Sequence, residues 1–268
     1  MKLFKNHYSK PILKTFFKQL LSKNPTFSKK LKAGFSYCNK KHYLCRSTNF
    51  LSMPLHLHQD TRGLKIAFWQ IAETEDFFLR QAHFINPENL QRISHPQARL
   101  QWLASRLLLY RVLGPDHYKN LQKDSVGKPI SENQSFELSI SHSDELVAIA
   151  ISQQPIGIDI QRISAKMERI AHKFVPEKEL ETLMGMSKLS LETLHVHWGT
   201  KEALFKAYGK GQLDFKQHLH LNWHKGFVPE GDSFDAYVLK ADEKTEYRGH
   251  YEKVFKDYLF CHVTKKEI

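Results

Sequence analysis

The chain has 268 residues and a formal net charge of +12, from 40 Lys and Arg against 28 Asp and Glu. Three cysteines without disulfide or zinc spacing exclude a disulfide-stapled scaffold and predict a reducing, cytoplasmic location. Residues 1–52 hold 12 of the basic residues and no acid, which leaves 28 basic and 28 acidic residues in a formally neutral body, residues 53–268. The neutral body argues against nucleic-acid binding through a basic face.

Residues 1–52 contain an apolar stripe between lysines, formed by Ile12, Leu13, Phe16, Phe17, Leu20 and Leu21. This pattern is typical of a basic amphipathic helix that contacts a membrane or a partner, and its apolar run is too short to span a bilayer. The alternative, which we favour, is that Met53 is the natural start and residues 1–52 are an upstream extension, disordered or not native. Membrane contact is expected only if this segment is native.

The body opens with strand-like residues 65–71 and helix-like residues 73–81, followed by a longer helix over residues 95–113 that Gly114-Pro115 ends. Arg99 and Arg106 lie two turns apart and share a side of that helix. They are either solvated arginines whose stems cover the core or ligands for an anion.

Two polar fragments follow. Val126-Gly127-Lys128-Pro129 is a turn that presents a lysine to an anion or is an ordinary loop. Residues 136–143 form a predicted strand that ends in Ser141-His142-Ser143, either a plain polar strand end or a set of donors to phosphate oxygens. A hydrolase with a serine nucleophile is disfavoured, because no Gly-x-Ser-x-Gly motif is present and adjacent Ser and His point opposite ways on a strand.

Residues 146–152 are apolar and β-branched and predict a buried strand, which ends in a turn at Gln153-Gln154-Pro155. Residues 156–161 then alternate, with three isoleucines on one face and Gly157, Asp159 and Gln161 on the other. The isoleucines are expected in the core, and Asp159 and Gln161 are expected to face a cleft together. Gly157 leaves room for a ligand or another backbone.

Residues 189–208 predict a helix that ends at Gly209-Lys210-Gly211. Trp198, Glu202 and Lys206 lie at i, i+4 and i+8 on one side of it. The carboxylate and the ammonium serve a metal and a phosphate, or they form an ordinary surface pair worth about 0.3–0.5 kcal/mol. Strand signals return at residues 218–223, 234–241, 246–255 and 258–264.

In this order the fragments resemble the Sfp-type branch of the 4'-phosphopantetheinyl transferase superfamily. The matching segments are Gly127-Lys128-Pro129, Ser139-Ile140-Ser141-His142-Ser143, Gly157-Ile158-Asp159-Ile160 and Trp198 with Lys201-Glu202-Ala203 and Lys206. The resemblance implies an α+β fold of two related, pseudo-duplicated lobes with the active site between them. The expected domains are the extension 1–52, an N-terminal lobe 53–152 and a C-terminal lobe 153–268, in a chain expected to be monomeric.

The resemblance also implies an activity. Such enzymes transfer the phosphopantetheine arm of coenzyme A to a serine of an apo acyl or peptidyl carrier protein, require Mg²⁺ and release 3',5'-ADP. Matched positions make Asp159, Glu202 and Lys206 catalytic, with the metal held by Asp159 and Glu202. Glu202, or a water activated by the metal, would take the serine proton. Coenzyme A contacts are expected from Lys128, Pro129, Ser141, His142, Lys201, Arg99 and Arg106.

Gln161 departs from the family pattern, because many members have a glutamate two residues after the motif aspartate. A neutral amide oxygen is a poorer Mg²⁺ ligand than a carboxylate, so Gln161 is the third and weakest metal candidate. Two other functions remain open. One is a relative that binds coenzyme A or a carrier without efficient transfer, and the other is a membrane- or nucleic-acid-associated protein that acts through residues 1–52.

Overall fold

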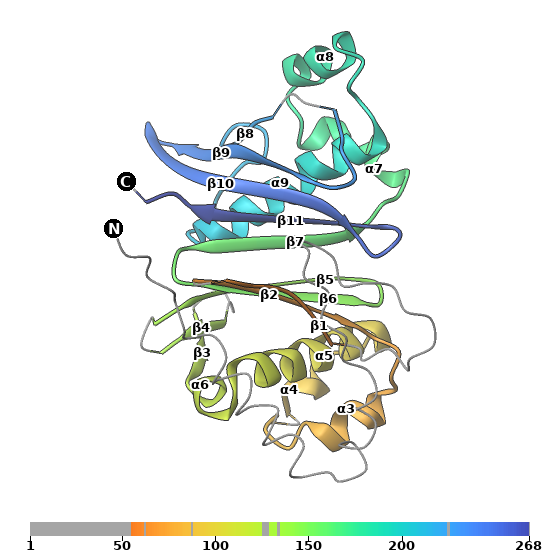
Figure 1. Cartoon of the computed structure of the whole chain (residues 1–268), viewed down its shortest axis with the longest axis vertical. Coiled ribbons are helices and arrows are strands. Elements are labelled where there is room, and N and C mark those ends of the chain that lie inside the picture. Colours follow the sequence, from red (N-terminus) through yellow and green to blue (C-terminus); the bar gives the residue numbers. More distant parts are fainter. Residues whose placement is uncertain are drawn as a thin grey trace, which may run out of the picture. The chain divides into compact units, whose positions relative to one another are not determined.

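The computed structural model describes residues 55–61, 63–86, 88–124, 129–132, 135–223 and 226–267 (Figure 1). All of them belong to one compact unit, Met53–Ile268. The unit Met1–Ser52, with its predicted amphipathic stripe, lies outside the described residues. Within the described ranges, no helix combines the length and the apolar character that crossing a bilayer requires.

The first half of the unit contains a four-stranded antiparallel sheet in the order β1-β2-β6-β5. Its strands are β1 (Leu55–Thr61), β2 (Leu64–Gln70), β5 (Glu137–Ser143) and β6 (Leu146–Ser152). Helix α5 (Pro96–Leu113) lies along one face of this sheet (Figure 1). The second half contains a five-stranded antiparallel sheet in the order β7-β11-β10-β9-β8.

The five strands of this second sheet are β7 (Ile156–Arg162), β8 (Leu219–Asn222), β9 (Asp232–Lys240), β10 (Glu243–Val254) and β11 (Tyr258–Lys265). Helix α9 (Leu191–Tyr208) packs on it; Ser190 caps the start of the helix and Gly209, at φ 69°, ends it. The shorter elements are α3 (Glu75–Gln81), α4 (Glu88–Gln91), α6 (Pro115–Lys119), β3 (Leu121–Lys123), β4 (Pro129–Ser131), α7 (Lys166–Ile170), η1 (Ala171–Lys173) and α8 (Glu177–Gly185).

The unit has four layers, in the order α5, first sheet, second sheet and α9, and apolar side chains fill the spaces between them. Between α5 and the first sheet lie Leu103, Leu107, Val147 and Ile149 with their neighbours. Between the two sheets lie apolar side chains of both: Ile66, Phe68, Ala148, Ile156, Ile158, Ile160 and Phe260. Helix α9 closes the far face of the second sheet with Val196, Ala203 and Leu204. The strands between two apolar layers are buried on both faces, which explains the continuous apolar run of β6.

Three serines join the edges of the two sheets. Alternate residues of β5, Ser139, Ser141 and Ser143, accept hydrogen bonds from the backbone N–H groups of Ile158, Ile160 and Arg162 on β7, at 3.1, 3.2 and 3.1 Å. A strand edge carries unpaired N–H groups, and here side-chain hydroxyls pair them. Because side chains alternate along a strand, the three serines lie on one face of β5, and their hydrogen bonds hold β5 beside β7.

The structure confirms the α+β class and most of the predicted elements. The predicted strands, the helix over 95–113 and the helix that ends at Gly209 all form, with boundaries shifted by a few residues. Strand β1 and the hairpin β3–β4 were not predicted. The predicted division near Gln153 falls in the turn between β6 and β7, where the chain passes from one sheet to the other. A duplication relationship between the halves stays a prediction.

Candidate active site

Asp159 lies on β7 with its side chain directed away from the inter-sheet core. The alternation of the strand places Ile156, Ile158 and Ile160 between the sheets and Asp159 on the face that α9 covers. The residue is 8% exposed, and its Oδ1 accepts hydrogen bonds from Ser141 Oγ at 2.9 Å and from Lys206 Nζ at 3.3 Å. Burial raises the pKa of Asp159, while the ammonium of Lys206 and the hydroxyl of Ser141 act in the opposite direction.

Two glycines let α9 approach β7 this closely. A Cβ built on Gly157 of β7 would lie 1.8 Å from the backbone oxygen of Ala203 on α9. A Cβ on Gly199 of α9 would lie 2.7 Å from Nε2 of Gln161 and 2.9 Å from Sγ of Cys261. All three distances are under 3.0 Å, and the one at Gly157 is to a backbone atom, so the absence of a side chain there lets the helix lie directly on the strand.

Glu202 projects from α9 near Asp159, and it is partly buried. Burial raises the pKa of Glu202, the negative charge of Asp159 raises it further, and Lys206 lowers it. One carboxylate comes from a strand and the other from a helix, and the charge of Asp159 acts on Glu202 electrostatically; that they hold a metal together stays a prediction. Asp159 is buried and Glu202 is partly buried, and their charges repel each other. A bound cation would lower the free energy of this arrangement.

Lys206 connects the three elements that meet here. Its Nζ donates to Ser141 Oγ of β5 at 3.1 Å, to the carbonyl oxygen of Ile158 at 2.8 Å and to Asp159 Oδ1 at 3.3 Å, both on β7. Its side chain is 28% exposed, so the ammonium lies at the border between the protein and solvent. This position suits a group that exchanges a protein contact for a substrate phosphate.

His142 lies on β5 and Arg106 on α5, and both are candidate phosphate ligands. His142 follows Ser141 on β5, so its side chain points to the opposite face from the serine. Burial lowers the pKa of His142, and the charges of Lys206 and, to a smaller degree, Arg106 lower it further. Arg106 lies 5.0 Å above the ring of Trp102 on the same helix. Arg106, His142 and Lys206 thus come from three elements, α5, β5 and α9.

Gln161 shares the face of Asp159, as the alternation predicts, but its amide is used structurally. Its Nε2 donates to the carbonyl oxygen of His195 on α9 at 2.9 Å. This hydrogen bond holds the end of β7 against the helix. It uses the amide nitrogen of Gln161 as a donor, so the amide oxygen is the atom of this side chain that could bind a metal.

Lys201 occupies a different place from the one expected of a phosphate ligand. It is fully buried, and its Nζ donates to the carbonyl oxygens of Phe174 and Phe215 at 2.6 and 2.8 Å. The same two phenylalanines pack against Trp198, with ring centroids at 5.1 and 5.5 Å. Burial lowers the pKa of Lys201 to about 8. The structure thus uses Lys201 and Trp198 to hold two loops onto α9.

Arg99 is likewise engaged away from the cluster. Its guanidinium pairs with the carboxylate of Glu75 on α3 at 2.5 and 2.9 Å and donates to the carbonyl oxygens of Leu90 and Ile93. These contacts tie α3 and α4 to α5. Lys128 lies outside the described residues, and Pro129 opens β4, opposite Lys123 of β3.

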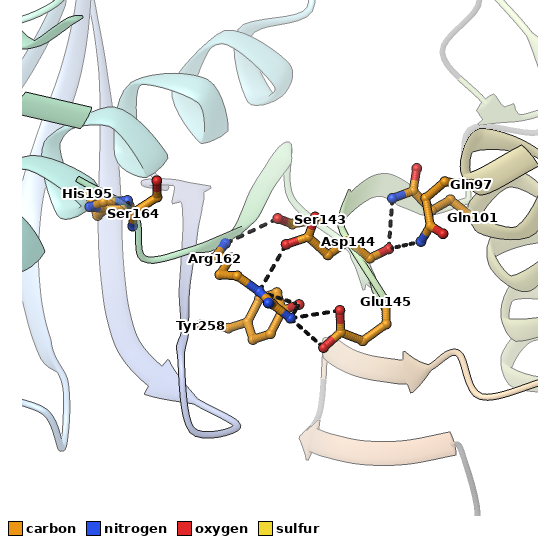
Figure 2. A network of polar contacts seen from close by, with 9 residues as sticks. All are labelled: Gln97, Gln101, Ser143, Asp144, Glu145, Arg162, Ser164, His195 and Tyr258. Carbon is orange, nitrogen blue, oxygen red and sulfur yellow. Dashed lines mark hydrogen bonds and ion pairs between the residues drawn. The ribbon is translucent and has the colours of Figure 1, made fainter. Parts of the chain in front are cut away.

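Arg162, directly after Gln161, was missed by the sequence reasoning. It contacts the turn that follows His142, as Figure 2 shows. A basic residue at the end of the strand that carries Asp159 was the only available signal, and nothing in the sequence indicated its partners.

The donors of this site fit Mg²⁺. The ion prefers oxygen ligands and is bound in proteins by one or two carboxylates together with substrate phosphates. Asp159 and Glu202 would supply the two carboxylates, and a bound cation would relieve the repulsion that raises the pKa of Glu202. In the described ranges, no group of three or more His, Cys, Asp and Glu side chains could hold a metal, so substrate or water oxygens would have to complete the shell.

Comparisons with known proteins agree with this geometry. A family model described as "4'-phosphopantetheinyl transferase superfamily" matches residues 155–261, from the turn before β7 to Cys261 on β11. The chain is 39% identical over 174 residues to 4'-phosphopantetheinyl transferase gsp of Aneurinibacillus migulanus, covering 62% of this chain and 70% of the relative.

Two further relatives carry the same description. The chain is 36% identical over 92 residues to 4'-phosphopantetheinyl transferase psf-1 of Bacillus pumilus, covering 34% of this chain and 40% of the relative. It is 31% identical over 153 residues to 4'-phosphopantetheinyl transferase Sfp of Bacillus subtilis (strain 168), covering 51% of this chain and 67% of the relative. The chain therefore belongs to the 4'-phosphopantetheinyl transferase superfamily, which confirms the Sfp-type resemblance and the transferase class predicted from its motifs.

Proposed function

We propose that this chain transfers the 4'-phosphopantetheine arm of coenzyme A to a serine of an apo acyl or peptidyl carrier protein, with Mg²⁺ held by Asp159 and Glu202. The observation that carries the proposal is the convergence of a strand carboxylate, a helix carboxylate and the Lys206 ammonium beside Ser141. Membership of the transferase superfamily and three relatives described as 4'-phosphopantetheinyl transferases support it.

Four hydrogen-bonding groups suit the phosphates of coenzyme A. Lys206 and Ser141 lie beside Asp159, where a metal-bound diphosphate would be, and they are assigned to it. Arg106 and His142 lie on the α5 side and are assigned to the remaining phosphate. Lys128, Pro129, Lys201 and Arg99 remain candidates from the motifs, but the buried contacts of Lys201 and the ion pair of Arg99 favour structural roles for these two.

The transfer requires an in-line displacement at phosphorus. The carrier serine oxygen forms a bond to the phosphorus that bears the pantetheine arm, the bridging P–O bond of the diphosphate breaks, and 3',5'-ADP leaves. Bound Mg²⁺ supplies neutralisation of the charge that develops on the phosphate oxygens. Lys206 adds a positive charge that Ser141 and Ile158 hold beside Asp159 before the substrate binds.

Glu202 is assigned as the group that takes the serine proton. Burial and the neighbouring charge of Asp159 raise the pKa of Glu202 in the metal-free protein, and a bound Mg²⁺ would act in the opposite direction. Gln161 contributes by positioning: its bond to the carbonyl of His195 holds the end of β7 against α9, and its amide oxygen is the third metal candidate.

The proposal also covers the domain organisation, the oligomeric state, the location and the partners. The two halves are proposed to be related lobes, 53–152 and 153–268, in a monomeric, cytoplasmic enzyme whose partners are coenzyme A and a carrier protein. Nucleic acid is not among the proposed partners. Residues 1–52 are proposed to be dispensable for transfer.

The test is transfer itself. The full chain is incubated with coenzyme A, MgCl₂ and a panel of apo carrier proteins, and the carriers are weighed by mass spectrometry. A mass gain of one phosphopantetheine arm on the carrier serine, lost when EDTA replaces MgCl₂, is the expected result. Coenzyme A binding without any mass gain across the panel would favour the second candidate, a binding relative whose Gln161 replaces a metal carboxylate. A chain that lacks residues 1–52 is expected to transfer at the rate of the full chain.

A further inference from the structure

Arg162 ends β7 and contacts three consecutive residues of the turn between β5 and β6. Its backbone N–H donates to Ser143 Oγ at 3.1 Å, its Nε lies 2.9 Å from Asp144 Oδ2, and its Nη2 lies 2.6 and 2.8 Å from the two oxygens of Glu145. It also donates to the hydroxyl of Tyr258 on β11, and the guanidinium lies 5.1 Å from the centre of that ring. Figure 2 shows the guanidinium between the turn and the tyrosine.

The same turn is held from its other side by α5. The backbone oxygen of Asp144 accepts hydrogen bonds from Gln97 Nε2 at 2.6 Å and from Gln101 Nε2 at 2.9 Å (Figure 2). Asp144 has a φ of 47°, in the left-handed region that aspartate tolerates in tight turns. The turn is therefore fixed in one conformation between α5 and Arg162.

The strand end that carries Arg162 is in turn held by α9. Gln161 Nε2 donates to the carbonyl oxygen of His195, and the backbone N–H of Ser164 donates to His195 Nε2 at 3.1 Å. The other ring nitrogen of His195 bonds to the carbonyl oxygen of Leu191. A continuous polar chain thus runs from α5 through the turn and Arg162 to β7 and α9.

This chain connects the elements that carry the proposed site. Arg106 lies on α5, His142 is two residues before Asp144, Asp159 is three residues before Arg162, and Glu202 and Lys206 lie on α9. We propose that Arg162 is a positioning residue, which sets the phosphate-binding groups of the first half at the correct distance from the metal-binding groups of the second half. The inference rests on the proposed function. The guanidinium contacts the turn that follows His142, so it acts through that turn.

Because Arg162 is exposed, its effect on the position of the binding groups can be measured apart from its effect on folding stability. Its side chain is 46% exposed, and those of Asp144 and Glu145 are 55% and 37% exposed. Ion pairs this exposed contribute little to folding. A displacement of binding groups by about 1 Å, by contrast, can lower a rate about a hundredfold. The loss of Arg162 is therefore expected to change coenzyme A use much more than it changes unfolding.

Arg162→Ala is compared with Arg162→Lys and with Arg248→Ala as the matched control. Arg248 on β10 forms a similar exposed pair with Asp235 at 3.0 Å. Arg162→Ala is expected to raise the KM for coenzyme A and to lower kcat/KM roughly 10- to 100-fold, with a Tm change of no more than about 4 °C. Arg162→Lys keeps the charge but cannot bridge all its partners, so its kcat/KM is expected to lie between those of Arg162→Ala and the wild type. Arg248→Ala is expected to match the wild type in both.

Hydrogen exchange of the peptide that covers residues 141–146 is measured on the same proteins without substrate. It is expected to speed up in Arg162→Ala and to stay unchanged in Arg248→Ala. If the wild type transfers the arm and Arg162→Ala has a kcat/KM within twofold of it, the inference is wrong and the proposed function stands. If the wild type transfers nothing, the proposed function fails, and the exchange rates then decide alone whether Arg162 fixes the turn: unchanged rates overturn the inference.

Discussion

Gly157 of β7 lies directly against the backbone of Ala203 on α9, so closely that a Cβ on the glycine would be 1.8 Å from the Ala203 oxygen and 2.7 Å from the Ala207 nitrogen. The helix therefore packs on the strand without an intervening side chain. Because Asp159 is two residues beyond Gly157 and Glu202 precedes Ala203, this contact sets the separation of the two carboxylates. One missing methyl group thus determines the geometry of the proposed metal site.

Gly157→Ala is expected to lower both stability and transfer, because the clash is with backbone atoms that cannot rotate away. Overpacking of this kind costs about 1–3 kcal/mol, and the displaced α9 would carry Glu202 and Lys206 with it. Thermal unfolding and kcat/KM are the measurements. Gly185→Ala on α8 is the matched control, since a Cβ there meets nothing within 4 Å. A Gly157→Ala enzyme with wild-type Tm and rate would show that α9 does not depend on this contact.

Asp159→Asn and Glu202→Gln are each expected to reduce turnover at least about a hundredfold, because metal catalysis supplies several kcal/mol of barrier reduction. Each change removes one negative oxygen ligand and keeps the side-chain shape. The Mg²⁺ concentration that gives half-maximal rate is also expected to rise. Glu246→Gln, an exposed carboxylate of β10 that pairs with Lys244, serves as the control. Near-normal rates in both site variants would refute the assigned metal ligands.

The fold was predictable where periodicity is strong. The isoleucines of β7 and the apolar run of β6 gave the correct strands and the correct faces, because a period of two can only be satisfied by one orientation against a core. The turn at residues 153–155 correctly marked the passage from one sheet to the other. Strand β1 was not predicted: its alternation is limited to Leu55 and Leu57, and the strand ends in the polar run Gln59-Asp60-Thr61.

The roles of the basic residues were less predictable than their positions. Lys201 and Lys206 lie on the same helix, and the sequence assigns both to phosphates. In the structure Lys201 is surrounded by loops that the sequence does not place, around Phe174 and Phe215, whereas Lys206 faces β5 and β7. Arg99 finds its partner in Glu75, 24 residues earlier. Such pairings depend on tertiary contacts, so a motif alone cannot decide between binding and structure.

The two lysines are expected to respond oppositely to replacement by methionine. Lys201→Met leaves two buried carbonyl oxygens without a donor, which costs about 1–3 kcal/mol for each unsatisfied group, so the Tm is expected to fall. Lys206→Met removes a partly exposed charge beside Asp159, so the KM for coenzyme A is expected to rise about tenfold, the effect of losing roughly 1.4 kcal/mol of binding. Thermal unfolding and steady-state kinetics on both variants make the comparison. A stable Lys201→Met with a raised KM would return Lys201 to the phosphate ligands.

His262 on β11 is expected to make stability depend on pH. The pKa of His262 is lowered to about 4. Burial is the largest cause, the charges of His250 and His58 act in the same direction, and Glu252 opposes them. As the pH falls below about 6.5, the unfolded chain takes up a proton on His262 and the folded protein does not. The contribution of His262 to the free energy of unfolding is therefore fully present above that pH and is lost as the pH falls towards 4. Between pH 7 and pH 5.5 the loss from this residue is about 1 kcal/mol.

Urea unfolding of His262→Phe at both pH values tests this expectation. The Nδ1 of His262 is buried without a hydrogen-bond partner among the described residues, so an apolar ring of similar size removes the titration without leaving a lost bond. The variant is expected to lose about 1 kcal/mol less than the wild type on acidification, because its ring cannot take up the proton in either state. Replacement of the exposed His117 by Asn is the control and should leave the wild-type difference unchanged. Equal acid sensitivity in His262→Phe and the wild type would mean that His262 is protonated in the folded protein as readily as in the unfolded chain.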